Sequence, residues 1–243
     1  MPGATRIEWT ESSWNPVTGC TKVSEGCRNC YAERLAQRLC RIGLSAYRNG
    51  FEVTLHPDVL PVPLSWKKPR YIFVNSMSDL FHEHVPSGFI LDVFEVMKRA
   101  EWHTFQVLTK RPDRLIELDS SLEWAPNIWM GVTVESSEHL CRLDCLRRTG
   151  AKVRFVSFEP LLGHITDADL HGIDWAIVGG ESGSGARRME AEWALALRDA
   201  CICEGVPFFF KQWGGSRRKA AGRLLDGRIW DEMPRGDRWI GCS

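Results

Sequence analysis

Short apolar runs that recur along the chain constrain its fold more than any other feature of the sequence. Six of them are rich in β-branched and aromatic residues, and their starts are roughly 20 to 33 residues apart, which is the spacing of strand–helix units. They cover residues 71–75, 104–109, 128–134, 153–157, 175–179 and 207–211. Near-continuous apolar runs of this length are typical of strands buried on both faces of a parallel sheet.

Segments with helical periodicity separate these runs. The clearest covers residues 89–99 and repeats apolar side chains at Ile90, Val93, Phe94 and Met97. Further helices are expected over 31–39, 137–148 and 190–203. Strands that alternate with helices imply a parallel sheet with right-handed crossovers, which a barrel and an open doubly wound sheet both satisfy.

The residues that follow the strands favour the barrel. Polar side chains follow almost every apolar run: Asn75, Ser76, Ser78 and Asp79; Thr109, Lys110 and Arg111; Thr133 and Glu135; Ser157 and Glu159; Gly179, Gly180, Glu181 and Ser182; Lys211 and Gln212. An open sheet concentrates such residues at one switch point, whereas a barrel gathers them from all strands at its carboxyl-end mouth. We therefore predict an α/β fold, a partial (β/α) barrel of about six parallel strands. The alternative is that polar residues simply end strands.

The last thirty or so residues differ in composition from the rest of the chain. They contain Gly214-Gly215, a basic stretch over 217–219, and Asp226-Gly227 between two short apolar runs, which is the signal of a type I′ hairpin. We predict that residues 1–214 form the barrel with an N-terminal cysteine loop, and that residues 215–243 form a C-terminal hairpin extension.

The overall composition excludes several classes of protein. Hydrophobic residues make up 44% of the 243 residues and charged residues 26%, so the chain can bury a core and is not dominantly disordered. The apolar stretches are too short or too interrupted for a membrane span, and residues 1–6 lack the apolar core of a signal peptide. We expect a cytoplasmic monomer. The net charge of zero argues against nucleic-acid binding through bulk positive charge, but leaves a local basic patch open.

Three of the nine cysteines cluster in one segment. An odd number of cysteines makes a disulfide framework unexpected, but Cys20, Cys27 and Cys30 precede an expected helix, with flexible glycines at 19 and 26. A structural zinc site normally has four ligands, whereas a 4Fe-4S cluster bound by three thiolates keeps one iron open for another ligand. The three thiols therefore favour an iron–sulfur cluster.

Two other interpretations of the cysteine cluster remain open. A zinc ion could take its fourth ligand from elsewhere in the chain, for example from His56, His82 or Cys40, or the clustering could be chance. The scattered cysteines are most simply small apolar core residues. Cys141 and Cys145, four apart on an expected helix, could resemble a metal-binding pair, but no second pair lies nearby in the sequence.

A three-cysteine loop on a βα barrel resembles the radical S-adenosylmethionine (SAM) enzymes. Gly179-Gly180-Glu181 resembles their Gly-Gly-Glu element, which contacts the amino group of SAM. The resemblance places a first strand before the cysteine loop. The element usually follows the second strand; counted in this way it follows about the sixth here, and residues 75–79 occupy the second-strand position. The six-residue gap between Cys20 and Cys27 also departs from the usual three. A second resemblance covers nearly the whole chain, to a phage and bacterial family of three-cysteine proteins. It rests on segments 14–20, 73–81, 108–112, 158–162, 178–182 and 211–214. That family is itself similar to radical SAM enzymes and distantly to spore photoproduct lyase, a DNA repair enzyme.

The resemblance implies a 4Fe-4S cluster on the three cysteines, SAM as a cofactor and an external electron donor. Carboxylates near SAM can receive its ammonium group, and hydroxyls and amides can bind its ribose. The residues expected to bind the cofactor are Asn75, Ser76, Ser78, Asp79, Thr133, Glu135, Ser157, Glu159, Gly179, Gly180 and Glu181. No catalytic residue is assigned from the sequence.

Cations at the expected mouth suggest a phosphate-bearing substrate. The residues expected to bind it are Lys110, Arg111, Arg187 and Lys211, with Trp213 placed to stack on a base and Arg217, Arg218 and Lys219 extending the strip. We therefore expect an enzyme that acts on nucleic acid, DNA rather than RNA, in repair or modification. The alternatives are a small phosphorylated substrate, cations that merely pair with the mouth carboxylates, a non-enzymatic nucleic-acid-binding protein with a structural zinc or cluster, and a metal-assisted nuclease or hydrolase.

Overall fold

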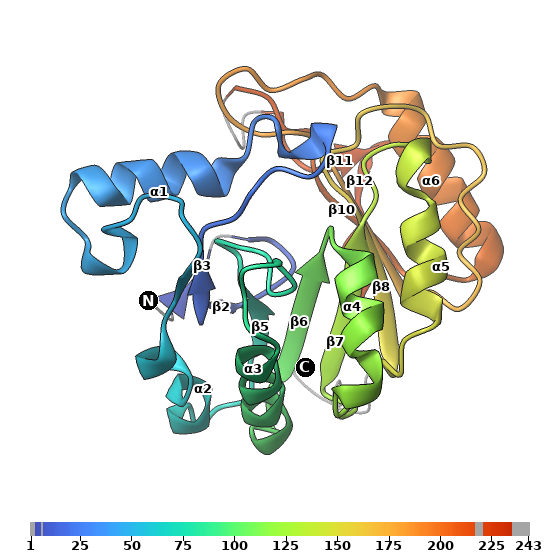
Figure 1. Ribbon diagram of the computed structural model, residues 1–243. Coiled ribbons are helices and arrows are strands. Elements are labelled where there is room, and N and C mark those ends of the chain that lie inside the picture. Colours follow the sequence, from blue (N-terminus) through green and yellow to red (C-terminus); the bar gives the residue numbers. More distant parts are fainter. Residues whose placement is uncertain (1–2, 6, 217–220, 235–243) are drawn as a thin grey trace.

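An eight-stranded sheet forms the centre of the computed structural model, which describes residues 3–5, 7–216 and 221–234 (Figure 1). Its order is β1 (Gly3–Ala4), β2 (Ser12–Trp14), β5 (Tyr71–Val74), β6 (Thr104–Thr109), β7 (Ile128–Thr133), β8 (Val153–Phe158), β9 (Trp175–Gly179) and β10 (Phe208–Gln212). Only β1 is antiparallel to its neighbour; the other seven strands are parallel and curl into a half-barrel. The predicted partial barrel is confirmed, with seven parallel strands where about six were expected.

The additional parallel strand is β2, which the sequence pattern did not reveal. It has three residues, two of them serines, so it is too short and too polar to be recognised as an apolar run. The sheet itself makes it a strand, because Ser12, Ser13 and Trp14 pair in register with Ile72, Phe73 and Val74 of β5. The side chain of Trp14 is fully buried, so β2 begins the parallel sheet just before the cysteine cluster.

Helices cover the convex face of the sheet, whereas α1 lies near the carboxyl ends of the strands (Figure 1). The α-helices are α1 (Tyr31–Arg41), α2 (Val62–Ser65), α3 (Ser87–Arg99), α4 (Pro112–Leu118), α5 (Cys141–Arg147) and α6 (Ala191–Glu204). The predicted helices correspond to α1, α3, α5 and α6. Within the described residues no helix is both long and apolar enough to span a membrane.

The remaining elements are short. Strands β3 (Val17–Thr18) and β4 (Thr54–Leu55) pair beside the sheet, and 3-10 helices cover Glu25–Cys27, Ser45–Tyr47, Pro57–Val59, Asp119–Ser121 and Ser137–His139. The helix predicted over 137–148 is therefore divided, with a 3-10 turn before α5. Helix α4, with seven residues, was not predicted.

Two apolar cores lie on opposite faces of the sheet. The larger fills the space between the convex face and the helices, with Ile90, Phe94 and Leu197 among its members. The smaller lines the concave face and is mainly aromatic: Trp9, Phe73, Trp129, Phe155, Trp175, Ile177 and Phe209. These side chains fill one end of the half-barrel, so any open volume inside it must lie towards the other end, at the carboxyl ends of the strands.

The predicted C-terminal hairpin is present. Strands β11 (Leu224–Leu225) and β12 (Arg228–Ile229) are joined by Asp226 and Gly227, whose positive φ values of 53° and 76° suit a type I′ turn. Leu225 is buried in the larger core, so the hairpin packs on the barrel. The domain boundary at residue 214 stays a prediction, and the basic residues 217–219 lie outside the described part of the chain.

Candidate functional site

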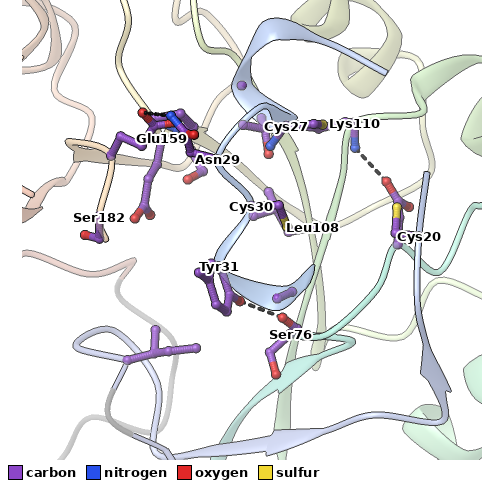
Figure 2. Close-up of a pocket in the computed structure, with 18 of the residues that line it drawn as sticks. Cys20, Cys27, Asn29, Cys30, Tyr31, Ser76, Leu108, Lys110, Glu159 and Ser182 are labelled. Atoms are coloured by element: carbon purple, nitrogen blue, oxygen red, sulfur yellow. Dashed lines mark hydrogen bonds between the residues drawn. The ribbon is translucent and has the colours of Figure 1, made fainter. Parts of the chain in front are cut away.

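A cavity of about 330 Å³ opens at the carboxyl ends of the parallel strands (Figure 2). Its volume is at the lower end of the range typical of small-molecule sites. The aromatic cluster forms its floor, since Trp9 and Phe73 line it from below, and the loop that carries the three cysteines forms part of its wall. The cavity therefore lies where a barrel enzyme places its reacting groups.

Most of the site residues predicted from the sequence line this cavity. They are Cys20, Cys27, Cys30, Asn75, Ser76, Ser78, Asp79, Lys110, Thr133, Ser157, Glu159, Gly180, Glu181 and Lys211. The predicted residues that lie outside the lining are Arg111, Glu135, Gly179, Arg187 and Trp213. The strand-end pattern thus located the cavity, but it did not separate residues that face it from residues that lie behind its wall.

The three clustered cysteines line the same cavity and are free of disulfides. Burial, assisted by the nearby charge of Asp79, raises the pKa of the Cys20 thiol to about 11, while Arg111 opposes that shift. A bound metal cation would reverse this preference, because it stabilises the thiolate directly. In their present positions, no three His, Cys, Asp or Glu side chains of the described residues are arranged to hold a metal ion.

The set of donor atoms around the cavity nevertheless suits a cluster with one open iron. Three cysteines line one cavity, and no fourth cysteine or histidine of the described chain lines it. The nitrogen Nδ2 of Asn75, at the same wall, is buried without a hydrogen-bond partner, so this wall has a polar group that its own neighbours do not satisfy. Three cysteines at one cavity fit a 4Fe-4S cluster with one open iron, and the N–H groups of Asn75 would donate to an acceptor atom on a further ligand.

The side chains considered as a fourth zinc ligand bond elsewhere. The imidazole of His56 bonds the Thr18 hydroxyl at 2.8 Å, that of His82 bonds the Thr21 hydroxyl at 2.9 Å, and the Cys40 thiol donates to the Arg48 carbonyl at 3.7 Å. None of the three lines the cavity.

The turn after β5 builds one wall of the cavity. Asn75 has a φ of 59°, a left-handed conformation that asparagine tolerates better than most residues. Its side-chain oxygen accepts the Val17 amide at 3.2 Å, which ties this turn to the chain just before the cysteines. Asp79 accepts the Thr109 hydroxyl at 2.7 Å and the Lys110 amide at 3.0 Å. The carboxylate of Asp79 thus joins the ends of β5 and β6.

The cations predicted at the mouth are paired with carboxylates. Lys211 Nζ lies 2.6 Å from Glu159 Oε1, and Lys110 Nζ lies 3.8 Å from Glu135 Oε1. Trp213 packs on Phe210, and its indole nitrogen donates to a backbone carbonyl rather than lining the cavity. Charge pairing at the mouth, one of the alternatives from the sequence, is therefore observed.

The Gly-Gly-Glu segment has a packing role of its own. A Cβ atom on Gly180 would collide with the carbonyl oxygen of Trp213, so glycine allows the loops after β9 and β10 to approach closely. The Glu181 carboxylate accepts Asn29 Nδ2 at 2.9 Å and Arg187 Nη2 at 2.7 Å. Burial opposes the ionisation of Glu181, but the hydrogen bonds from Arg187 and Asn29 lower its pKa below the ordinary value.

Several lining residues were not found by sequence reasoning. Asn29 and Tyr31 come from the start of α1, and the Tyr31 hydroxyl donates to the Ser76 carbonyl at 2.6 Å (Figure 2). Gln212 and Ser182 also line the cavity. The sequence pattern had placed Ser182 and Gln212 among the polar strand-end residues without assigning them to the site, whereas the position of Asn29 and Tyr31 depends on how the cysteine segment folds back over the sheet.

Comparisons with known proteins identify a family and a similar fold. A family model described as a protein of unknown function (DUF5131) matches residues 4–234. A cysteine-to-serine variant of spore photoproduct lyase has a similar structure at 13% identity and a TM-score of 0.50, covering 74% of this chain and 58% of the other. The complex of spore photoproduct lyase with a dinucleoside spore photoproduct is similar at 13% identity and a TM-score of 0.49, with the same coverages. No curated protein sequence matches the chain.

The structural likeness establishes a shared fold. The chain spans 58% of the length of the solved lyase structure, so part of that protein has no counterpart here. The phage and bacterial three-cysteine family, inferred from sequence segments, stays a prediction.

Proposed function

This chain belongs to the DUF5131 family, and we propose that it is an iron–sulfur enzyme of the radical SAM type. One observation carries the proposal: Cys20, Cys27 and Cys30 line a single cavity at the carboxyl end of a half-barrel, together with polar residues from several strand ends. The fold shared with spore photoproduct lyase supports it.

Each part of the cavity has a role in this proposal. The three thiolates would hold the cluster, and the strand-end hydroxyls, amides and carboxylates would bind SAM. When bound, the cluster and SAM would supply one-electron chemistry at a carbon–hydrogen or carbon–carbon bond of the substrate. The aromatic floor, which Trp9 and Phe73 present to the cavity, excludes water from below, and this protects a reactive site from side reactions.

Metal content tests the proposal most directly. Each of Cys20, Cys27 and Cys30 is changed to Ala, and iron, sulfide and visible absorbance are measured after anaerobic reconstitution. Each variant should lose most of its cluster, while Cys203→Ala, at an exposed site on α6, should retain it. Full cluster content in all three variants would rule out the assignment. Zinc without sulfide in the wild type would favour a structural metal in a non-enzymatic protein.

The cofactor is tested separately. Calorimetric titration with SAM should show binding to the cluster-loaded protein and not to the apo protein, and reduction should then release 5′-deoxyadenosine. Equal binding to both forms, or binding to neither, contradicts the SAM assignment. Nuclease activity that requires Mg²⁺ but no SAM would support a metal-assisted hydrolase instead.

The proposed substrate is nucleic acid, with DNA tested before RNA. Because Lys211 is paired with Glu159 and Lys110 lies near Glu135, only a few phosphates can be held, and the salt dependence should correspond to about two to four of them. Single-stranded and damaged duplex DNA are the first ligands to test, since a base reaches a buried site only when it is extruded. Binding that ignores Lys110→Ala and Lys211→Ala would shift the proposal to a small phosphorylated substrate.

A further inference from the structure

We propose that charged residues after β6, β7 and β9 are positioning residues that hold the cysteine loop, residues 20–30, over the cavity before any metal binds. These residues are Arg111, Glu135, and the pair Glu181 and Arg187. The inference rests on the proposed function for its purpose, because it concerns how the cluster ligands are placed. It assigns these four side chains to the loop instead of to SAM or substrate phosphates.

The first contact holds the beginning of the cysteine loop. Arg111 Nη2 donates to the Thr21 carbonyl at 3.1 Å and to the Thr21 hydroxyl at 2.9 Å, and it lies 3.8 Å from Cys20 Sγ. The other end of the guanidinium is held by Glu83, at 2.8 Å from Nη1. The Arg111 side chain is 11% exposed, so its orientation is fixed by contacts on both sides.

The second contact supports the middle of the loop. The Glu135 carboxylate is 1% exposed and accepts the Ser24 hydroxyl. Arg142 Nη1 donates to the same carboxylate at 2.7 Å. A Cβ atom on Gly26 would collide with the Glu135 side chain, so glycine lets the loop backbone rest directly on the carboxylate. Burial opposes the charge of Glu135, but Lys110 and Arg142 lower its pKa below the ordinary value.

The third contact holds the last part of the loop. Arg187 Nη2 donates to the Glu25 carbonyl at 2.8 Å and to Glu181 Oε1 at 2.7 Å. Glu181 Oε2 also accepts Asn29 Nδ2 at 2.9 Å, directly before Cys30. The loop is therefore attached on both sides of Cys27 to the segment that follows β9.

Together the three contacts reach the loop next to each cysteine. They come from three different strand ends, so residues that follow the sheet strands contact the loop along its whole length. A loop ordered in advance loses less conformational entropy when it binds a ligand. If Cys20 held a cluster, Arg111 would have an additional role, because an N–H group near a ligating sulfur would stabilise negative charge there and raise the reduction potential.

Hydrogen exchange in the metal-free protein tests the positioning role without any cluster. In Arg111→Gln, Glu135→Gln and Arg187→Gln, amides of residues 20–30 should exchange faster, on the order of tenfold, which is the loss of about one hydrogen bond to a charged group. Arg147→Gln is the matched control, because Arg147 donates to the carbonyls of Asp169 and His171, far from the cysteine loop in sequence and contact. Unchanged exchange in all three variants would overturn the proposal.

One further variant covers the case in which Glu135→Gln does not fold. Ser24→Ala removes the hydroxyl that donates to Glu135, together with its 3.7 Å contact to Cys27 Sγ, and leaves the buried carboxylate paired with Arg142. It should increase exchange in the middle of the loop while the melting temperature stays close to that of the wild type. Wild-type exchange in this variant would contradict the second contact.

The reconstituted protein provides a readout that a purely structural role would not change. The reduction potential of the cluster should fall in Arg111→Gln and return most of the way in Arg111→Lys, while Arg187→Gln should alter iron content without the same change in potential. If the wild type binds no iron but the exchange result holds, the proposed function fails and the loop contacts stand. If the wild type binds iron but exchange is unaffected in the variants, the proposed function stands and the positioning role of the loop contacts fails.

Discussion

The floor and the rim of the half-barrel are built from the same strands but have opposite chemistry. In β8, Phe155 belongs to the aromatic floor and Ser157, two residues later, lines the cavity. In β10, Phe209 belongs to the aromatic floor and Lys211, two residues later, lines the cavity. Residues two apart in a strand point to the same face, so a change from aromatic to polar within one such step separates the packed core from the lining of the cavity.

The aromatic floor is a connected network. Trp175 contacts Phe155 at 5.6 Å between ring centroids and Phe209 at 6.0 Å, and Trp9 contacts Phe73 at 4.6 Å. Such contacts resist rearrangement because interiors are close-packed. The rim is held instead by ion pairs and hydrogen bonds, whose net contributions are smaller and depend on pH. The comparison teaches that a packed aromatic core and the polar lining of a cavity are separated along the strands of one sheet.

The largest expected effect is on the floor. Trp175→Ala should lower the free energy of unfolding by about 3–5 kcal/mol, because it empties a fully buried aromatic site. Ser157→Ala, on the same face at the rim, should change it by less than about 1 kcal/mol. Denaturant unfolding of both variants measures the difference. Similar losses for the two variants would contradict the separation of floor and rim.

An intermediate effect is expected for the rim ion pair. Lys211→Met leaves the Glu159 carboxylate at a largely buried site without its cation, which should cost about 1–3 kcal/mol of stability. The double variant Lys211→Met, Glu159→Gln should recover much of that loss, because the unpaired charge is gone. A double-mutant cycle in denaturant measures the coupling. Additive losses would show that the two side chains do not act as a pair.

The smallest expected effect is on the pH dependence of the rim. The pKa of Glu181 is below its ordinary value of 4.5 in the folded protein, so its contribution is present above that pH and is lost as the pH falls through the folded pKa. Glu181→Gln should therefore lower the free energy of unfolding near neutral pH by about 1 kcal/mol, and that free energy should then fall less steeply as the pH is lowered. Trp175→Ala should keep the acid loss unchanged. Equal flattening in both variants would refute the assignment to the rim.

The strands of the fold could be predicted closely because the signal for each is local. The run expected over 104–109 is β6 with the same bounds, and that over 175–179 is β9. Strand β2 was missed because a strand of three residues has no period of its own and exists only through pairing with β5. The cysteine cluster was found from spacing alone, but its placement on the cavity wall needed the folded chain.

The roles of the charged strand-end residues were the part that sequence reasoning could not decide. Arg111 and Glu135 were expected to face a substrate or a cofactor, and each instead contacts the cysteine loop, at Thr21 and at Ser24. Nothing in the neighbouring sequence of either residue indicates such a partner. These contacts join positions separated by 90 and 111 residues.

By itself, the sequence of this protein determined the alternation of strands and helices, the end of the sheet that carries polar groups, and the clustering of three cysteines in one segment. These properties follow from side-chain periodicity and spacing, which act over a few neighbouring residues. Only the tertiary structure decided that the barrel closes halfway, that the mouth cations are paired, and that the cysteine loop lies over the strand ends. The physical reason is that a charged side chain takes whichever partner the completed fold brings within a few ångströms, and in this protein that partner is distant in the chain.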